Sequence, residues 1–218
     1  MNAYLEEIRE VLLLSLGTCT VSLSLVFIFG LPLTLFLFLK KFSRKNLILA
    51  LCQSLLFIPS VTLGLLLYFL LRRNGVLGSL ELLYTPGALI IGQFLLIIPL
   101  FVALSYHLLR SLGTEYLEQV ISLGANLFQL GFAVFRKCRP QILAAVIICG
   151  SRVLSETSMA MILGGNIKGQ TRLFTTAIVL HTMRGEFEIA VLLGLVLFLI
   201  SAGLGFLFIL FQKDGTAD

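Results

Sequence analysis

Long apolar runs separated by short polar segments dominate the chain. Five runs are long enough to cross a bilayer, and they cover residues 11–39, 47–71, 88–109, 141–163 and 189–211. A hydrocarbon core about 30 Å thick needs roughly 20 apolar residues per helical span, and an unbroken helix is favoured because no backbone group can stay unpaired there. The pattern predicts a single all-α polytopic membrane domain, residues 1–218, with about five transmembrane helices.

The first run is longer than one crossing requires. Gly30 and Pro32 lie inside it, and they predict a kink, a tilt or an N-terminal portion at the membrane interface. Basic residues in short loops set the orientation, because cytoplasmic loops carry the excess of Lys and Arg. With the N-terminus outside, inner segments hold nine basic residues and outer segments six, and the block KKFSRKN directly follows the first span. We therefore expect the N-terminus outside and the C-terminus inside.

Two outer segments, residues 72–87 and 164–186, are rich in turn-forming residues and too polar to cross. Within the second, residues 173–180 are apolar but span only about half a crossing. A short helix inserted into the outer mouth of the bundle would explain this pattern. An amphipathic helix lying on the outer leaflet would explain it equally well.

Composition agrees with a membrane protein. The 218 residues are 58% hydrophobic and 12% charged, with a mean hydropathy of +1.04, so too few polar side chains exist to cover a water-facing surface. The net charge of +5 suits loops near anionic head groups, and no basic run is interleaved with aromatics, which argues against nucleic-acid binding. The acidic start, Met1 to Glu10, lacks the basic region of a cleavable signal peptide, so we expect the first run to remain a span.

Arg152 and Glu156 lie near the middle of the fourth run, where insertion of each charge costs about 2.5–3.5 kcal/mol. Their spacing places them on one helical face together with Ser151 and Ser155. Such a face can pair internally, pair across a subunit interface or line a watery passage. A structural salt bridge that locks neighbouring helices is the alternative to a role in transport. The order Arg then Glu is the weaker one for an intrahelical pair, which favours partners on other helices.

Hydroxyl donors and a guanidinium gather in the second outer segment, at Thr171, Arg172, Thr175 and Thr176. This combination suits a tetrahedral oxyanion, because it can replace part of the anion's hydration shell. A helix that caps itself with threonine would show the same residues. His107 and His181 stand singly, and no GxSxG or GxxxxGK[ST] motif occurs, so we expect no catalytic residue, no metal site and no cofactor.

The inner segment 115–140 suits two short helices separated by a turn at Gly124-Ala125-Asn126. Glycine accepts a left-handed backbone at little cost and would end the first helix. An apolar surface then faces the cytosol, made of Leu117, Val120, Ile121 and Leu123. An exposed apolar patch on a polar loop usually marks a docking site.

This segment resembles the cytoplasmic loop of permease subunits in binding-protein-dependent ABC importers. That family's signature is Glu-Ala-Ala, three residues, Gly, and nine residues later an aliphatic residue followed by Leu-Pro. Glu118 and Gly124 match its first half, and Val134 occupies the aliphatic position. Gln119 and Val120 replace the alanines, and the proline comes late, at Pro140. The resemblance implies that Glu118, Gly124, Ala125 and Val134 couple the chain to an ATPase.

Further segments extend the resemblance over nearly the whole chain. FGLPL, from Phe29, is similar to the Gly-x-Pro step of the family's first core helix. IPSVTLGLLLYFLL, LLYTPGALIIGQ and SRVLSETSMAMILGGNIKGQTRLFTTAIVL, which start at Ile58, Leu82 and Ser151, are similar to the tungstate branch of the molybdate and tungstate permeases.

The resemblance implies a type I permease fold in the cell membrane of a prokaryote, ATP-driven import of tungstate or molybdate, and a passage formed in part by Arg152, Glu156, Thr171, Arg172 and Thr175. It also implies a homodimer, two cytosolic ABC ATPase subunits and an extracytoplasmic oxyanion-binding protein.

Other transport functions remain open at this point. An ABC permease for sulfate, phosphonate or an amino acid would share most of these features, because substrate choice lies mainly in the binding protein. An ion-coupled secondary transporter could use Arg152 and Glu156 as a proton relay, although the inverted repeat that would support it is not visible. An intramembrane enzyme would need a nucleophile paired with a base, which the spacing of the serines and histidines does not offer.

Overall fold

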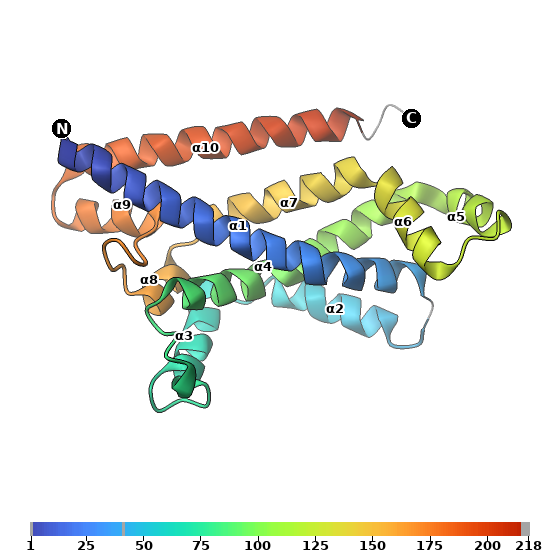
Figure 1. Ribbon diagram of the computed structural model, residues 1–218, viewed down its shortest axis with the longest axis horizontal. Helices are drawn as coiled ribbons and strands as arrows, with labels where there is room; N and C mark the ends of the chain where they lie inside the picture. Colours follow the sequence, from blue (N-terminus) through green and yellow to red (C-terminus); the bar gives the residue numbers. More distant parts are fainter. Residues whose placement is uncertain (1, 41, 215–218) are drawn as a thin grey trace.

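The computed structural model describes residues 2–40 and 42–214, which form an elongated bundle of helices (Figure 1). No strand occurs in this described part. Ten α-helices follow one another there, with 3₁₀ turns at Gly78–Leu80 and Arg110–Leu112: α1 (Asn2–Leu39), α2 (Lys45–Leu55), α3 (Ser60–Leu71), α4 (Pro86–Leu109), α5 (Gly113–Ser122), α6 (Leu127–Lys137), α7 (Arg139–Leu154), α8 (Ser158–Gly164), α9 (Phe174–Met183) and α10 (Phe187–Asp214).

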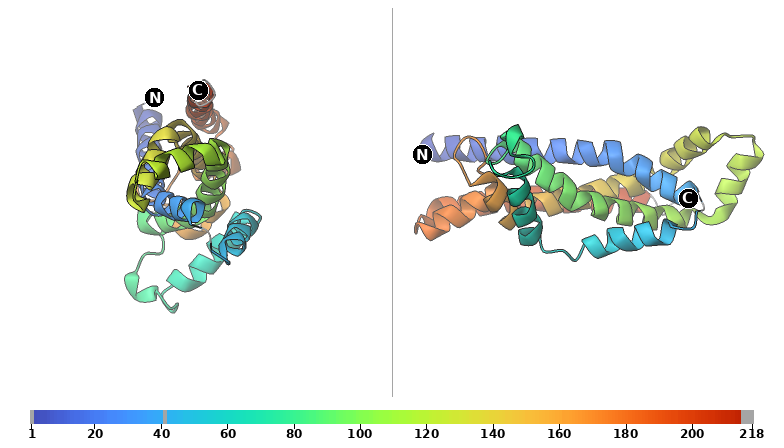
Figure 2. Two further views of the ribbon diagram at one scale, coloured as in Figure 1. Left: turned by 90° about the vertical axis from the view of Figure 1, so that its right-hand side faces the viewer. Right: turned by 90° about the horizontal axis from the view of Figure 1, so that it is seen from below.

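Three helices, α1, α4 and α10, are each long and apolar enough to cross a membrane. They contain the first, third and fifth apolar runs, and Pro32 lies inside α1 without ending it. The start of α1 lies with α9 at one end of the bundle, while α10 runs toward the other end, where α5 and α6 lie (Figures 1 and 2). The described chain therefore begins and ends at opposite ends of the long axis, as an odd number of crossings requires.

The second and fourth apolar runs each form two helices that meet at an angle, a bend that the apolar pattern did not indicate. Helices α2 and α3 meet at 99°, and α7 and α8 meet at 64°. At the first break Pro59 has an extended ψ of 133° and no N–H to donate, so the helix cannot continue through it. Counting each bent pair as one span, the described residues provide up to five crossings.

The main core lies where α1, α4, α6 and α7 meet. Its fully buried side chains include Ile97, Phe101, Val134, Ile142 and Cys149. Helices α1 and α4 approach closely at Gly30, where an added Cβ would lie 2.9 Å from the Phe101 ring. Close van der Waals packing among these side chains holds α6 to the helices that cross the membrane.

Helix α9 lies inside the bundle rather than on its surface. Its first turn, from Phe174 to Ala177, is buried, and Phe174 and Ala177 pack with Val11 of α1 and Leu193 of α10. Of the two alternatives for the short apolar stretch in the outer segment, the inserted helix is therefore the one observed.

Candidate functional site

The α5–α6 hairpin extends from the end of the bundle opposite the start of α1 (Figure 2). Gly124 follows α5 with φ at +80°, a left-handed conformation that glycine adopts without strain. Asn126 then caps α6, because its side chain accepts the Gln129 N–H at 2.9 Å while the Gln129 side chain accepts the Asn126 N–H at 2.9 Å. This capping box fixes where α6 begins, and the two predicted helices with their turn are both present.

The exposed apolar surface of the hairpin differs in part from the predicted one. Leu123 and Phe128 are 87% and 84% exposed, and Ile121 and Leu127 are also exposed. Leu117, by contrast, packs against the main core, and Val120 is only half-exposed. We name Ile121, Leu123, Leu127 and Phe128 the hairpin patch.

The residues that match the coupling motif occupy distinct places in this hairpin. Glu118 is exposed on α5, while Gly124 and Ala125 form the turn. Val134 is fully buried in the main core. It therefore connects α6 to the bundle rather than offering a contact surface.

Arg152 and Glu156 pair directly, so the expectation that they would find partners on other helices is wrong. Arg152 Nη1 donates to Glu156 Oε2 at 2.7 Å. Glu156 lies in the break between α7 and α8. There its Oε1 accepts the Met159 N–H at 3.1 Å and its backbone carbonyl accepts the Thr175 hydroxyl at 2.8 Å.

The Arg152–Glu156 pair is asymmetric in exposure. The Glu156 side chain is 4% exposed and that of Arg152 is 40% exposed. Ser155 and Ser158 are exposed next to it, and Ser151 is half-exposed. We name Ser151, Arg152, Ser155 and Ser158 the α7–α8 polar strip, and it lies on the outside of this single chain.

The outer-segment donors are engaged within the protein. Thr171 Oγ1 donates to the Gly164 carbonyl and accepts the Ile167 N–H at 3.0 Å. Arg172 Nη1 donates to Glu7 Oε1 at 2.7 Å, and Arg172 Nε is buried with no hydrogen-bond partner among the described residues.

His181 belongs to a hydrogen-bond network that the sequence analysis missed. Its Nε2 lies 3.0 Å from Glu7 Oε1, and its Nδ1 lies 2.5 Å from Glu186 Oε2. Glu186, five residues after His181, was a local signal for this contact. Glu7 is far away in sequence and gave none. No group of three or more His, Cys, Asp or Glu placed to hold a metal ion occurs in the described ranges.

A second missed feature is a buried polar row between α1 and α4. Ser22 donates to Gln93 Oε1 at 2.8 Å, and Gln93 Nε2 donates to Thr18 Oγ1 at 3.4 Å. One turn earlier, Ser15 Oγ accepts the Phe174 N–H at 3.0 Å. The spacing of Ser15, Thr18 and Ser22 places them on one helical face, which could have signalled a polar contact inside the bundle.

A helical bundle with several bilayer-length apolar helices, a charged pair at a helix break and an apolar hairpin at one end defines a polytopic membrane protein of the permease class. The family described as "Binding-protein-dependent transport system inner membrane component" matches residues 26–213. The chain belongs to this family.

Three relatives are similar over most of their length. The chain is 36% identical to "Tungstate uptake system permease protein TupB" of Peptoclostridium acidaminophilum over 89% of this chain and 86% of that protein. It is 36% identical to the protein of the same name from Campylobacter jejuni, over 77% of this chain and 70% of that one. The chain is 30% identical to a "Probable anion ABC transporter permease protein" of Haloferax volcanii, over 87% of this chain and 84% of that protein.

Proposed function

We propose that the chain is the permease subunit of an ABC importer for an oxyanion, tungstate or molybdate, in the cell membrane of a prokaryote. The observation that carries this proposal is the 36% identity to a tungstate permease over 89% of the chain. The Haloferax relative, named as an anion permease, supports the substrate class.

The hairpin patch supplies the proposed contact with a cytosolic ATPase subunit. Because Val134 is buried among α1, α4 and α7, a force on α6 is transmitted to the core of the bundle. Closure of the ATPase subunits on ATP then moves the spans and opens the passage outward, where an extracytoplasmic binding protein releases the anion. Hydrolysis restores the inward-facing state, since an energy source must favour one conformation over the other.

The α7–α8 polar strip supports a homodimer. A guanidinium with 40% of its side chain exposed is costly against hydrocarbon, so we place the strip against a second copy, around a central passage. Arg152 offsets part of the hydration that a dianion loses there, and Glu156 positions it through their 2.7 Å hydrogen bond.

Thr171, Arg172 and Thr175 form the outer wall of the proposed passage. The Thr171 and Thr175 hydroxyls and Arg172 Nη1 donate to Gly164, Glu156 and Glu7, so in this conformation these groups hold the wall together, while Arg172 Nε has no partner among the described residues. Weak attraction of the anion suits this arrangement, because tight binding would prevent release.

Uptake of labelled tungstate by proteoliposomes containing the permease, its ATPase and its binding protein tests the function. We expect uptake that requires ATP and is outcompeted by molybdate but not by sulfate. Glu118→Lys should abolish uptake while the protein still inserts into the membrane. Uptake driven by a proton gradient without the ATPase would instead favour a secondary transporter.

A further inference from the structure

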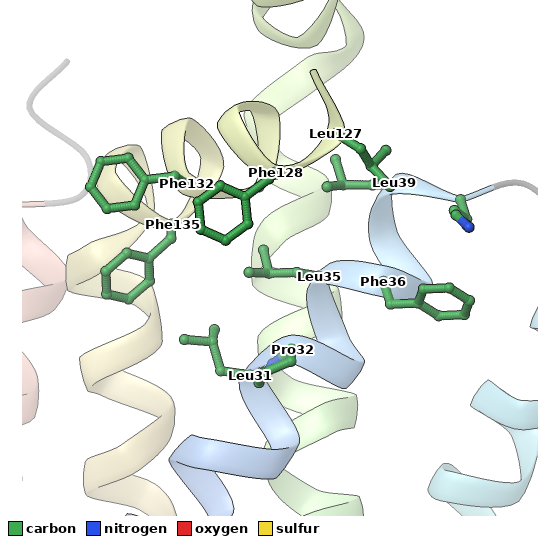
Figure 3. A pocket seen from close by; sticks show the side chains of 11 residues that line it. Leu31, Pro32, Leu35, Phe36, Leu39, Leu127, Phe128, Phe132 and Phe135 are labelled. Carbon is green, nitrogen blue, oxygen red and sulfur yellow. The ribbon is translucent and has the colours of Figure 1, made fainter. Parts of the chain in front are cut away.

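An apolar groove separates the C-terminal third of α1 from α6. Figure 3 shows Phe128 and Phe135 of α6 facing Leu31 and Leu35 of α1 across it. Its volume is about 550 Å³, and its walls are formed by Leu31, Pro32, Leu35, Phe36, Leu39, Lys40, Leu127, Phe128, Gly131, Phe132 and Phe135. The groove lies apart from the α7–α8 polar strip, so the proposed anion passage does not account for it.

The groove carries positive charge and no negative charge. Lys40, the one charged residue in its wall, lies with its Nζ 5.2 Å from the centre of the Phe36 ring. The Arg139 guanidinium lies 5.7 Å from the centre of the Phe135 ring, another wall residue. The face of an aromatic ring attracts a cation. The apolar groove therefore has positive charge at its border.

The bundle end that carries this groove also carries Lys40, Arg44 and Lys45 of the basic block and the α5–α6 hairpin (Figure 1), which places it on the predicted cytosolic side. The inner leaflet is rich in anionic lipid and attracts basic residues near its surface. We propose that the groove binds an anionic phospholipid of the inner leaflet, with an acyl chain along the Leu and Phe walls and the phosphate at Lys40.

A helix of a second copy fits the groove less well. Among the described residues the wall holds Lys40 and no acidic residue, so a phosphate of opposite charge complements it, whereas an apolar helix face would not. A flexible acyl chain is narrower and meets the apolar walls along its whole length. Leu127 and Phe128 belong both to the groove wall and to the hairpin patch, so a bound lipid lies directly beside the proposed ATPase contact.

Native mass spectrometry of the purified full chain tests the proposal, with phosphatidylglycerol and phosphatidylcholine of equal chain length offered together. We expect the wild-type chain to retain phosphatidylglycerol in preference to phosphatidylcholine. Lys40→Gln should reduce that preference about fivefold, since one basic residue near an anionic surface contributes about 1 kcal/mol. Gly131→Leu should remove binding, because a Cβ at Gly131 meets only Leu39, at 3.7 Å, and the larger side chain enters the groove.

Two variants serve as matched controls. Gly17→Leu adds the same side chain at an exposed α1 position where a Cβ meets nothing within 4 Å, and Arg73→Gln removes a basic residue at the other end of the bundle. Both should retain lipid as the wild type does. Equal retention of the two lipids by the wild type, or unchanged preference in Lys40→Gln, would overturn the proposal. A cross-link from a photoreactive residue at Phe128 to a second copy would assign the groove to dimerisation instead.

Discussion

Individual charged residues in this protein differ mainly in whether their partner is local. Arg152 and Glu156 are four residues apart and pair within one bent segment. Glu7, Arg172 and His181 come from α1 and the outer segment, and they form one network. The first pair is visible in the sequence as a spacing, while the second set depends on how α1 packs against α9.

Arg152→Gln tests the role of the guanidinium in transport. A charge-assisted hydrogen bond or ion contact contributes about 1.5–3 kcal/mol, so we expect the rate of tungstate uptake to fall roughly ten- to hundredfold. Arg152→Lys keeps the charge but not the planar guanidinium. Its uptake rate should lie between those of the wild type and Arg152→Gln. The measurement is initial uptake in proteoliposomes, with Lys168→Gln as a control. If Arg152→Gln and Lys168→Gln reduce the uptake rate equally, Arg152 has no specific role in transport.

Glu7→Ala tests the outer network. Glu7 Oε1 contacts both Arg172 and His181, and the side chains of Glu7, Arg172 and His181 are no more than 12% exposed. Removing one partner of a largely buried ion pair leaves an uncompensated charge and costs about 3 kcal/mol. Unfolding in mixed micelles measures this loss. Glu10→Ala, at an exposed position on the same helix, should change stability by less than about 0.5 kcal/mol, and an equal loss there would refute the network's importance.

At the scale of elements, the structure separates residues that hold helices together from residues that present a surface. Helix α6 shows both on its two sides. Val134 and Leu130 are buried against the bundle, whereas Leu127 and Phe128 are exposed. With these two faces, α6 can bind a partner protein on its exposed side and transmit that partner's movement to the bundle through its buried side.

Phe128→Ser and Val134→Ala form a matched pair on α6. Phe128 is 84% exposed, so Phe128→Ser should leave stability within about 0.5 kcal/mol of wild type while ATP-driven uptake is lost. Val134→Ala removes buried methyl groups and should cost about 2 kcal/mol. Thermal unfolding and uptake are measured on both. If Phe128→Ser destabilises the chain as much as Val134→Ala does, the hairpin patch is not a free docking surface.

At the scale of the whole molecule, the single chain exposes surface that a membrane alone does not explain. Much of α10 faces outward, with Phe198 and Leu199 more than 60% exposed, and lipid covers such a face without cost. The α7–α8 polar strip, in contrast, exposes a guanidinium and hydroxyls at a helix break between apolar segments. The outward face of α10 suits contact with lipid. The α7–α8 polar strip suits contact with a second copy of the chain around a water-filled passage.

Ser155→Cys tests this arrangement. In a chain whose native cysteines are replaced by alanine, we expect Ser155→Cys to form an oxidised dimer in membranes, because the proposed interface brings the two strips together. Gly17→Cys, exposed on α1, should remain monomeric under the same oxidation. The dimer fraction is read from non-reducing gels. Efficient cross-linking at Gly17 with none at Ser155 would place the interface on another face.

Prediction from sequence succeeded where the signal is local and failed where it depends on distant contacts. The apolar runs and the turn at Gly124 each depend on residues close together in the sequence, and the structure has them. Two of the five expected spans are bent. Pro59 marks the first break in the sequence, whereas the second break has no proline, and the Glu156 side chain that accepts the Met159 N–H at the start of α8 was not recognised as a cap. Phe128 was not assigned to the exposed patch, because only the packing of α6 decides which of its apolar faces is buried.

The amino-acid sequence alone determined that this is a helical membrane protein with a polar hairpin between its apolar segments, because hydrocarbon admits few other solutions for such a composition. Tertiary structure alone decided that Glu7 joins Arg172 and His181, that α9 inserts into the bundle, and that a groove opens between α1 and α6. Each of these depends on residues far apart in sequence, and their proximity arises only when the helices pack.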